Sequence, residues 1–343
     1  MTAEELAVFY PRGHGKHYFP GHPERPERVE EIRRVLEEEG IWQQAKKLQP
    51  LDLKRELLES IHTAAYLLRF EKASSSSRSL DLDTYTTEES WQLALNAAGG
   101  AAETARSVWR GEAGRGFSLS RPPGHHATSD RGMGFCLLNN AALAAEYLLQ
   151  QERAGTLAIV DLDLHHGNGT QDIFYQRGDV SYCSIHQSPF YPGTGSLQER
   201  GEGLGRGKTL NIPLLAGAGD TAYQTLTEEI LLPFLDQQRP EMLLVSYGFD
   251  IHWRDPLGGM RVSAAGYYRM IGSLTRWAEQ HTGGRIVLIL EGGYDLEAAR
   301  ACSLGAVRAL LGEDFQDPLG PPPGEDTQRW RAVLDRAGSL LQT

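Results

Sequence analysis

The sequence predicts an α/β fold in which helices cover both faces of a mainly parallel β-sheet. Two observations lead to this prediction: short apolar runs alternate with longer amphipathic segments, and most of the runs are continuous stretches rich in Val, Ile and Leu. Continuous apolar strands are typical of parallel sheets buried on both faces. The 343 residues, of which 40% are hydrophobic, can bury a sizeable core. Since the alternation continues over most of the chain, we predict a single domain spanning residues 1–343.

Seven apolar runs are the expected strands. They cover residues 6–10, 116–119, 157–163, 180–186, 209–214, 242–248 and 286–291. Ligands of open α/β sheets bind at the carboxyl ends of the strands. The chemically reactive side chains gather in five segments that close or follow these runs, at residues 121–126, 161–166, 186–195, 250–259 and 291–295. The sequence therefore predicts a functional site at that edge of the sheet.

Amphipathic segments between the strands are the expected helices. They cover residues 26–39, 88–109, 140–150, 221–237 and 264–280. Ser263 directly precedes the last of them and is the expected N-cap, because its side-chain oxygen can accept a hydrogen bond from a free backbone N–H. A serine-rich stretch at 73–79 predicts an exposed loop. A proline-rich connector near 317–326 precedes a short C-terminal helix expected near 327–341.

Composition and charge argue against several classes of protein. The chain has 34 Lys and Arg against 45 Asp and Glu, a formal charge of −11, which disfavours nonspecific binding to nucleic acid. No apolar run approaches the ~18 residues that would cross a membrane. The acidic N-terminal start is unlike an export signal, so we expect a cytoplasmic protein. The three widely spaced cysteines predict reduced thiols.

The end of the run 157–163 predicts a metal site. Asp161, Asp163 and His165 alternate with leucines, so on a strand they would share one face. Burying three such groups is costly unless a cation compensates them. A catalytic zinc site needs a third protein ligand, and Asp250, which follows the run 242–248, is the candidate. By spacing alone, Asp250 fits a turn or a helix N-cap equally well.

Two other segments carry groups suited to proton transfer and carbonyl polarisation. His125 and His126 are adjacent imidazoles in a stiff Pro-Pro-Gly loop and suit general acid–base catalysis, although paired surface histidines are also common. Asp161 can hydrogen-bond one of these rings and set its tautomer. Tyr294 follows two glycines after the run 286–291, and its phenol can stabilise an oxyanion; a surface turn is the alternative.

Together these segments resemble the histone deacetylase superfamily, which includes bacterial histone-deacetylase-like amidohydrolases of the class II-like branch, acetylpolyamine amidohydrolases and acetoin-utilisation proteins. The matching motifs run in the family's order from about residue 20 to 310. They are residues 22–28, 121–126, 134–136 with 139–140, 161–169, 188–195, 248–250 with 255–259, and 291–294. The resemblance implies the arginase/deacetylase fold, a parallel sheet between helices with zinc at its edge.

The resemblance also implies a catalytic centre with one Zn²⁺ per chain, which Fe²⁺ could replace in the cell. The residues that match the family's metal ligands are Asp163, His165 and Asp250. His126 matches the principal general base and acid, and His125 its electrostatic partner, held by Asp161. Tyr294 matches the phenol that polarises the substrate carbonyl.

Further positions match sites around that centre. The residues that match a structural K⁺ or Na⁺ site are Asp161 and Ser184, with the backbone carbonyls of Asp163, His165 and Ile185. Phe135 and Tyr191 match the aromatic walls of the acyl-lysine tunnel, and Arg28 a buried arginine beneath the active site. Asn168 stands where many class I enzymes carry an acid beside the second histidine. Leu257 stands where polyamine-selective relatives can carry an acid, which favours an uncharged acyl-amide entrance.

The expected activity is zinc-dependent hydrolysis of an acyl-amide, with an acylated lysine peptide as the substrate and partner. The alternative is deacetylation of an acetylpolyamine or another small acylated amine, which the acidic chain would not repel. A ureohydrolase on the same fold needs a two-manganese cluster with more bridging carboxylates than the Asp-x-Asp-x-His pattern supplies. A non-catalytic acyl-binding module is disfavoured because both histidines, the three ligands and Tyr294 are all present.

Overall fold

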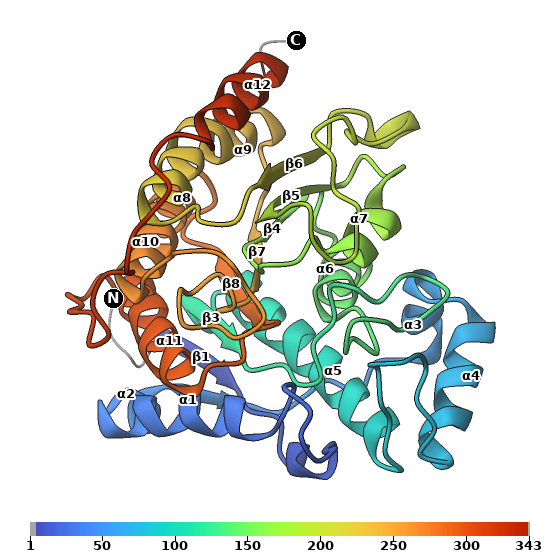
Figure 1. Cartoon of the computed structure of the whole chain (residues 1–343). Coiled ribbons are helices and arrows are strands. Elements are labelled where there is room, and N and C mark those ends of the chain that lie inside the picture. Colours follow the sequence, from blue (N-terminus) through green and yellow to red (C-terminus); the bar gives the residue numbers. More distant parts are fainter. Residues whose placement is uncertain (1–4, 342–343) are drawn as a thin grey trace.

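The computed structural model describes residues 5–341 and contains one eight-stranded sheet. All neighbouring strands pair in parallel, in the order β2-β1-β3-β8-β7-β4-β5-β6, and helices lie on both sides of the sheet (Figure 1). The predicted fold class is confirmed. Residues 1–4, which carry part of the acidic start used to predict the absence of an export signal, lie outside the described residues.

Seven of the strands coincide with the predicted apolar runs. The strands are β1 Leu6–Phe9, β2 Lys46–Leu48, β3 Arg115–Ser118, β4 Leu157–Asp161, β5 Val180–Gln187, β6 Thr209–Leu214, β7 Leu243–Tyr247 and β8 Ile286–Leu290. The sequence analysis missed β2, a three-residue edge strand in which both lysines are exposed. The expected strand 157–163 was too long, because β4 ends at Asp161 and the next residues form a loop.

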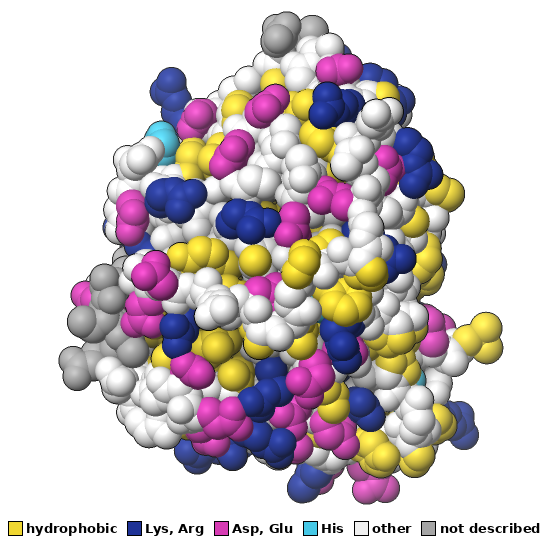
Figure 2. Space-filling model, turned by 60° about the vertical axis from the view of Figure 1, so that its left-hand side comes forward, with side chains coloured by type: hydrophobic (Ala, Val, Ile, Leu, Met, Phe, Trp, Pro, Cys, Tyr) yellow, Lys and Arg dark blue, Asp and Glu magenta, His cyan; other side chains and the backbone are white. Residues whose placement is uncertain are grey.

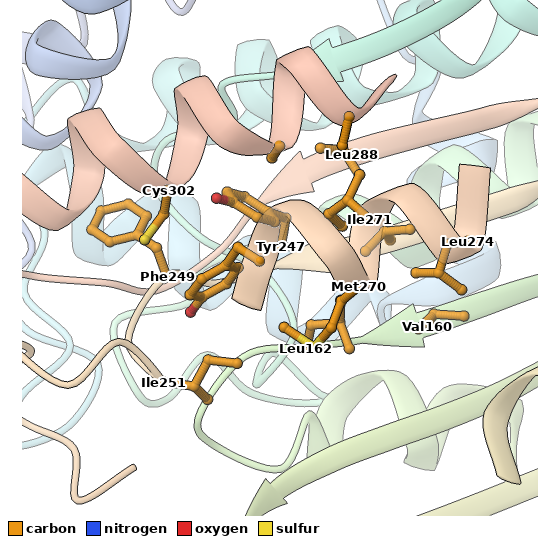
Figure 3. Packing of buried hydrophobic residues seen from close by; sticks show 14 of the residues in the cluster. Val160, Leu162, Tyr247, Phe249, Ile251, Met270, Ile271, Leu274, Leu288 and Cys302 are labelled. Atoms are coloured by element: carbon orange, nitrogen blue, oxygen red, sulfur yellow. The ribbon is translucent and has the colours of Figure 1, made fainter. Parts of the chain in front are cut away.

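The strands bury alternate side chains in two hydrophobic cores, one on each face of the sheet. In β4, Ala158 and Val160 belong to one core, whereas Leu157 and Ile159 belong to the other. Figure 3 shows the first core, where side chains of β4, β7 and β8 pack against those of α10 and α11. Burial on both faces explains why the strands read as continuous apolar runs.

Helices supply the two outer layers. They are α1 Glu27–Glu38, α2 Ile41–Gln44, α3 Arg55–Ile61, α4 Ala64–Ser75, α5 Ser90–Trp109, α6 Asn140–Gln151, α7 Asn168–Phe174, α8 Asp220–Leu226, α9 Leu232–Gln238, α10 Ala264–His281, α11 Leu296–Leu311 and α12 Arg331–Leu341, with short turns η2 His14–Lys16, η3 Gly203–Gly205 and η4 Thr227–Leu231. The predicted N-cap Ser263 accepts a hydrogen bond from the backbone N–H of Gly266, as expected.

Several helix predictions need correction. The predicted helix 221–237 is interrupted by the π-helical turn η4 between α8 and α9. The serine-rich stretch 73–79 is not wholly an exposed loop, because α4 continues to Ser75 and Ser74 is buried. The sequence analysis also missed α11, in which 12 of 16 residues are buried and only a narrow polar stripe of Glu297, Arg300 and Arg308 is left.

The C-terminal segment packs back on the body of the protein. Trp330, Val333 and Ala337 are buried in the core that also contains α8 and η4 residues. Figure 2 shows one face of the molecule, where basic and acidic side chains are intermixed with hydrophobic ones. Among the described residues, no helix has the length and apolarity needed to cross a membrane.

Candidate active site

The reactive segments meet at the carboxyl edge of the sheet, where β3, β8, β7 and β4 are neighbours. Asp161 is the last residue of β4, Asp250 lies three residues beyond β7, and Glu291 directly follows β8. The histidine pair lies in the loop after β3. Because parallel strands end at the same edge, these loops, which lie apart in the chain, converge on one site.

Asp163, His165 and Asp250, hereafter the ligand triad, offer ligand atoms that all lie within 4.8 Å of one another. Nδ1 of His165 is 3.1 Å from Oδ1 of Asp163 and 3.3 Å from Oδ2 of Asp250. Backbone N–H groups orient the carboxylates: that of Gly292 donates to Asp163, and that of Leu164 donates to Asp250. The arrangement brings the three predicted ligands together.

The ligand triad fits a divalent cation. Oδ2 of Asp250 is buried and accepts no hydrogen bond. A Cβ on Gly248 or Gly292 would clash with the carboxylates of Asp163 and Asp250, so only glycine leaves this space open. Burial and the nearby Asp163 raise the pKa of Asp250 to about 6, a sign that the Asp250 carboxylate is poorly compensated. Two carboxylates and one imidazole are a suitable donor set for zinc.

Asp161 is separate from the ligand triad, contrary to the expectation that it shares a strand face with Asp163 and His165. The chain leaves the strand after Asp161, whose Oδ2 contacts Nδ1 of His125 at 3.1 Å and accepts a hydrogen bond from the hydroxyl of Tyr182 at 3.0 Å. Its Oδ1 accepts from the backbone N–H of Asp163. Asp161 therefore orients the first histidine and the ligand loop.

The two histidines lie side by side in different electrostatic surroundings, with ring centroids 4.0 Å apart. Although burial opposes it, the carboxylates of Asp163 and Asp161 raise the pKa of His125 to about 10. Burial and the neighbouring His125 lower the pKa of His126 well below its usual range. Nδ1 of His126 is hydrogen-bonded to Oδ1 of Asn168 at 2.8 Å. The pair thus combines a cationic ring with a neutral one.

Tyr294 is held beside this pair by its backbone. The carboxylate of Asp255 accepts a hydrogen bond from the backbone N–H of Tyr294 at 2.6 Å and another from that of Leu257 at 2.9 Å. Burial raises the pKa of the Tyr294 phenol well above its usual range, so the hydroxyl keeps its proton. Asp255 therefore joins the phenol loop to the loop that carries Leu257.

A pocket of about 240 Å³ connects these groups to the surface. The predicted site residues that line it are His125, His126, Phe135, His165, Tyr191, Leu257 and Tyr294. The ring of Phe135 lies edge-on to Tyr294, with centroids 5.8 Å apart, and that of Tyr191 lies edge-on to His126 at 5.1 Å. The three residues predicted to form the tunnel are thus all on the wall of one cavity.

The residues predicted to hold a monovalent cation lie behind the pocket. Ser184 pairs with Asp161 across β4 and β5, and Ile185 is the next residue of β5. The hydroxyl of Ser184 is hydrogen-bonded to Nδ1 of His186 at 2.9 Å. The two strands therefore place Asp161, Ser184 and Ile185 next to one another.

Arg28 belongs to a buried ionic network, hereafter the Glu24 cluster (Glu24, Arg28 and Arg121). Arg121 contacts both carboxylate oxygens of Glu24, at 2.7 and 3.0 Å, and Arg28 donates to one of them at 3.1 Å. Arg28 also donates to the backbone carbonyls of Glu291 and Gly293. Burial opposes the effect, but the two guanidinium groups lower the pKa of Glu24 to about 2. The cluster supports the loop that leads to Tyr294.

Two residues of this site received no role from the sequence. Glu291 is fully buried and accepts hydrogen bonds from the backbone N–H groups of Gly124 and His125, so it fixes the histidine loop. It also forms a second metal-capable group with His125 and Cys136, but protein donors already occupy its oxygens. Asp255 is the other. Both lie within the matched motifs, and Glu291 also directly follows β8, which was the available signal for that residue.

Comparison with known proteins places the fold in the arginase/deacetylase class. Among solved structures, the HDA15 HD domain matches with a TM-score of 0.90 and 34% identity, covering 99% of this chain and 95% of that one. The histone deacetylase domain family matches residues 22–310. The chain therefore belongs to the histone deacetylase family, as the sequence motifs predicted.

Two curated relatives agree with this assignment. A probable deacetylase of Archaeoglobus fulgidus is 41% identical over 301 residues, which cover 86% of this chain and 83% of the relative. A histone deacetylase-like amidohydrolase of Pseudomonas aeruginosa is 38% identical over 303 residues, which cover 87% of this chain and 80% of the relative. Membership of this family supports a deacetylase or amidohydrolase activity.

Proposed function

We propose that the protein is a zinc-dependent deacylase that hydrolyses the amide between an acyl group, most simply acetyl, and a lysine-like amine. One observation carries the proposal: His165 of the ligand triad, His126 and Tyr294 line the same small pocket. A metal ligand, a proton carrier and a hydrogen-bond donor are three groups that metal-assisted amide hydrolysis uses. We place the reaction in the cytoplasm.

The ligand triad would hold Zn²⁺, or Fe²⁺ in its place, because both ions accept carboxylate and imidazole ligands. Zinc supplies a Lewis acid that polarises a carbonyl and lowers the pKa of water towards ~7. A structural K⁺ or Na⁺ would lie near Asp161, Ser184 and Ile185, where a cation offsets the buried carboxylate of Asp161.

His126 carries the proton. Because its ring is neutral, Nε2 can take a proton from the attacking water as the new C–O bond forms, and can then give it to the leaving nitrogen as the C–N bond breaks. Asn168 fixes the ring through Nδ1. His125, kept cationic by Asp161 and Asp163, stabilises the negative charge that develops in the transition state.

Tyr294 donates a hydrogen bond from its hydroxyl to the carbonyl oxygen. The raised pKa keeps the donor protonated at neutral pH, and the bond strengthens as that oxygen becomes negative. Phe135, Tyr191 and Leu257 give the pocket apolar walls that accept the aliphatic chain of the amine. A small acylated amine such as an acetylpolyamine remains the second candidate, because its aliphatic chain fits the same walls.

The test is turnover of an acetyl-lysine peptide and of acetylputrescine by purified protein, before and after chelation, with Tyr294→Phe as a matched variant. We expect peptide turnover that chelation abolishes and one equivalent of Zn²⁺ restores. Tyr294→Phe should lower kcat by about 10²–10³-fold while zinc still binds. Turnover that survives complete chelation, or that needs two manganese ions, would contradict the proposal.

A further inference from the structure

Large apolar side chains that face solvent are concentrated around the mouth of the pocket. Among the described residues, eight such side chains are exposed, and six of them lie in segments that line the pocket or contact a segment that lines it. These six, hereafter the apolar collar, are Tyr18, Phe19, Leu82, Phe190, Tyr191 and Leu215. The other two are elsewhere: Leu68 is on α4, and Leu204 is in η3 beside a different cavity. Clustered exposed apolar groups mark binding surfaces more often than scattered ones do.

One side of the collar is joined to the pocket by a row of rings. The exposed ring of Phe19 lies 5.7 Å from that of Tyr85, and Tyr85 lies 4.7 Å from His22. His22 lies 4.5 Å edge-on to Phe135, which lines the pocket. The collar is therefore continuous with the tunnel wall on this side. On the other side Phe190 and Tyr191 line the pocket directly.

Leu82 and Leu215 extend the collar outward. Leu82 is fully exposed and directly precedes Asp83, which lines the pocket and whose backbone carbonyl is hydrogen-bonded to His22. Leu215 is 44% exposed and follows the last residue of β6, whose carbonyl accepts a hydrogen bond from the backbone N–H of Ser188 at the start of the Phe190 loop.

Two acids and one base act on Tyr191 at the mouth of the pocket. Asp81 and Asp83 lie in the same loop as Leu82, and Arg131 is the cation that faces Tyr191 together with them. With a formal charge of −11 on the whole chain, an acidic ligand would be repelled, whereas a neutral or basic one would not.

We propose that the apolar collar binds the polypeptide on either side of the acylated lysine, and that it selects substrates with aromatic or aliphatic residues next to that lysine. This inference rests on the proposed deacylase function. A polyamine is a thin cationic chain that would pass through the collar and leave its apolar surface exposed. A peptide with apolar neighbours would cover that surface and bury it from water.

The experiment compares three acetyl-lysine substrates on the zinc-loaded protein: a peptide with Phe and Leu beside the lysine, the same peptide with Gly at both positions, and N-acetyl-lysine methylamide. We expect kcat/KM to be about 10-fold higher for the apolar peptide than for the Gly peptide. Phe19→Ala and Leu82→Ala should each lower this ratio about 3-fold and leave turnover of the methylamide unchanged. Leu68→Ala and Leu204→Ala are matched controls, since both leucines are exposed away from the mouth.

Fluorescence anisotropy with the two labelled peptides separates the two proposals. Absence of turnover on every substrate overturns the deacylase function, while the ratio of the two dissociation constants still decides whether the collar selects apolar flanks. Equal kcat/KM and equal affinity for the two peptides overturn the collar proposal, even if turnover is fast. A dimer that Phe19→Ala or Leu82→Ala dissociates in sedimentation also overturns it, because the collar would then bind a second copy of the chain.

Discussion

The ligand triad and the Glu24 cluster are both buried groups of charges, but they are neutralised in different ways. In the Glu24 cluster, both oxygens of the single carboxylate are bound by arginines, and those arginines also donate to backbone carbonyls. In the ligand triad, His165 lies against both carboxylates and His125 is also 3.7 Å from Asp163, but Oδ2 of Asp250 accepts no hydrogen bond. Arginines of the chain neutralise Glu24, whereas Asp250 has no such partner and would be neutralised by a bound metal cation.

The difference distinguishes charges that stabilise the structure from charges that serve the reaction. Charges that the protein itself pairs cost little to bury and hold the loops in place, but removing one partner is strongly destabilising. Charges that remain unpaired oppose folding and persist only where they serve binding or catalysis. Substitutions in the two groups should therefore have opposite effects on stability and activity.

Asp250→Asn should produce the largest effect. Loss of this ligand weakens metal binding, and we expect kcat/KM for an acetyl-lysine peptide to fall by about 10³-fold or more. In the metal-free protein the same substitution removes repulsion between two carboxylates, so the free energy of unfolding in urea should rise by about 1 kcal/mol. A metal-free variant less stable than the metal-free wild type would show that the triad is not strained by its charges.

Glu24→Gln should behave in the opposite way. It leaves two buried guanidinium groups without their carboxylate, and we expect a loss of about 3–5 kcal/mol in the free energy of unfolding, with or without metal. Urea denaturation monitored by circular dichroism measures this loss. Arg34, whose side chain is 60% exposed and forms an ion pair with Glu31, provides the control: Arg34→Gln should change stability by less than about 1 kcal/mol.

The pH dependence of the free energy of unfolding further distinguishes the Glu24 cluster from the ligand triad. The pKa of Glu24 is about 2, below its ordinary value of 4.5. Its contribution to stability is therefore complete above pH 4.5 and is lost as the pH falls towards 2, a change of about 3 kcal/mol. The difference in unfolding free energy between wild type and Glu24→Gln should shrink over that range. A difference that stays constant from pH 6 to pH 3 would contradict the ionic role of Glu24.

Asp255→Asn should give the smallest effect, confined to catalysis. An amide keeps one acceptor oxygen and turns its NH₂ towards the other backbone N–H, so either Tyr294 or Leu257 loses its anchor. We expect kcat to fall about 10-fold with little change in KM. If Asp255 acts by positioning the phenol, the substitution should have almost no further effect in a Tyr294→Phe background; additive losses would reject this role.

The sequence was sufficient to predict those elements that depend on patterns of neighbouring residues. Seven strands were found because residues buried on both faces of a sheet form unbroken apolar runs. The three-residue edge strand β2, with two exposed lysines, gave no such signal and was missed. The helix α11 was also missed, because most of its residues are buried and its polar face is narrow. The chemically reactive residues were found because they follow strands, and a shared sheet edge brings them together.

Local sequence patterns could not predict contacts between distant parts of the chain. Glu24 and Arg121 are separated by 97 positions, and neither has a neighbour in sequence that indicates the other. The separate position of Asp161 depended on where β4 ends, and a run of alternating residues does not mark that end. The roles of Asp255 and Glu291 likewise depend on backbone N–H groups of loops that only the fold brings near.

The position of β8 has a consequence for synthesis of the chain. It is the last strand in the described part of the chain, yet it lies between β3 and β7. Within residues 5–341, no other strand links the β2-β1-β3 half of the sheet to the β7-β4-β5-β6 half. Glu291 and Tyr294 directly follow it. A chain still on the ribosome at residue 285 holds both histidines and the ligand triad, but its sheet is in two pieces and it lacks the phenol. Synthesis of residues 286–295 thus completes both the sheet and the active site.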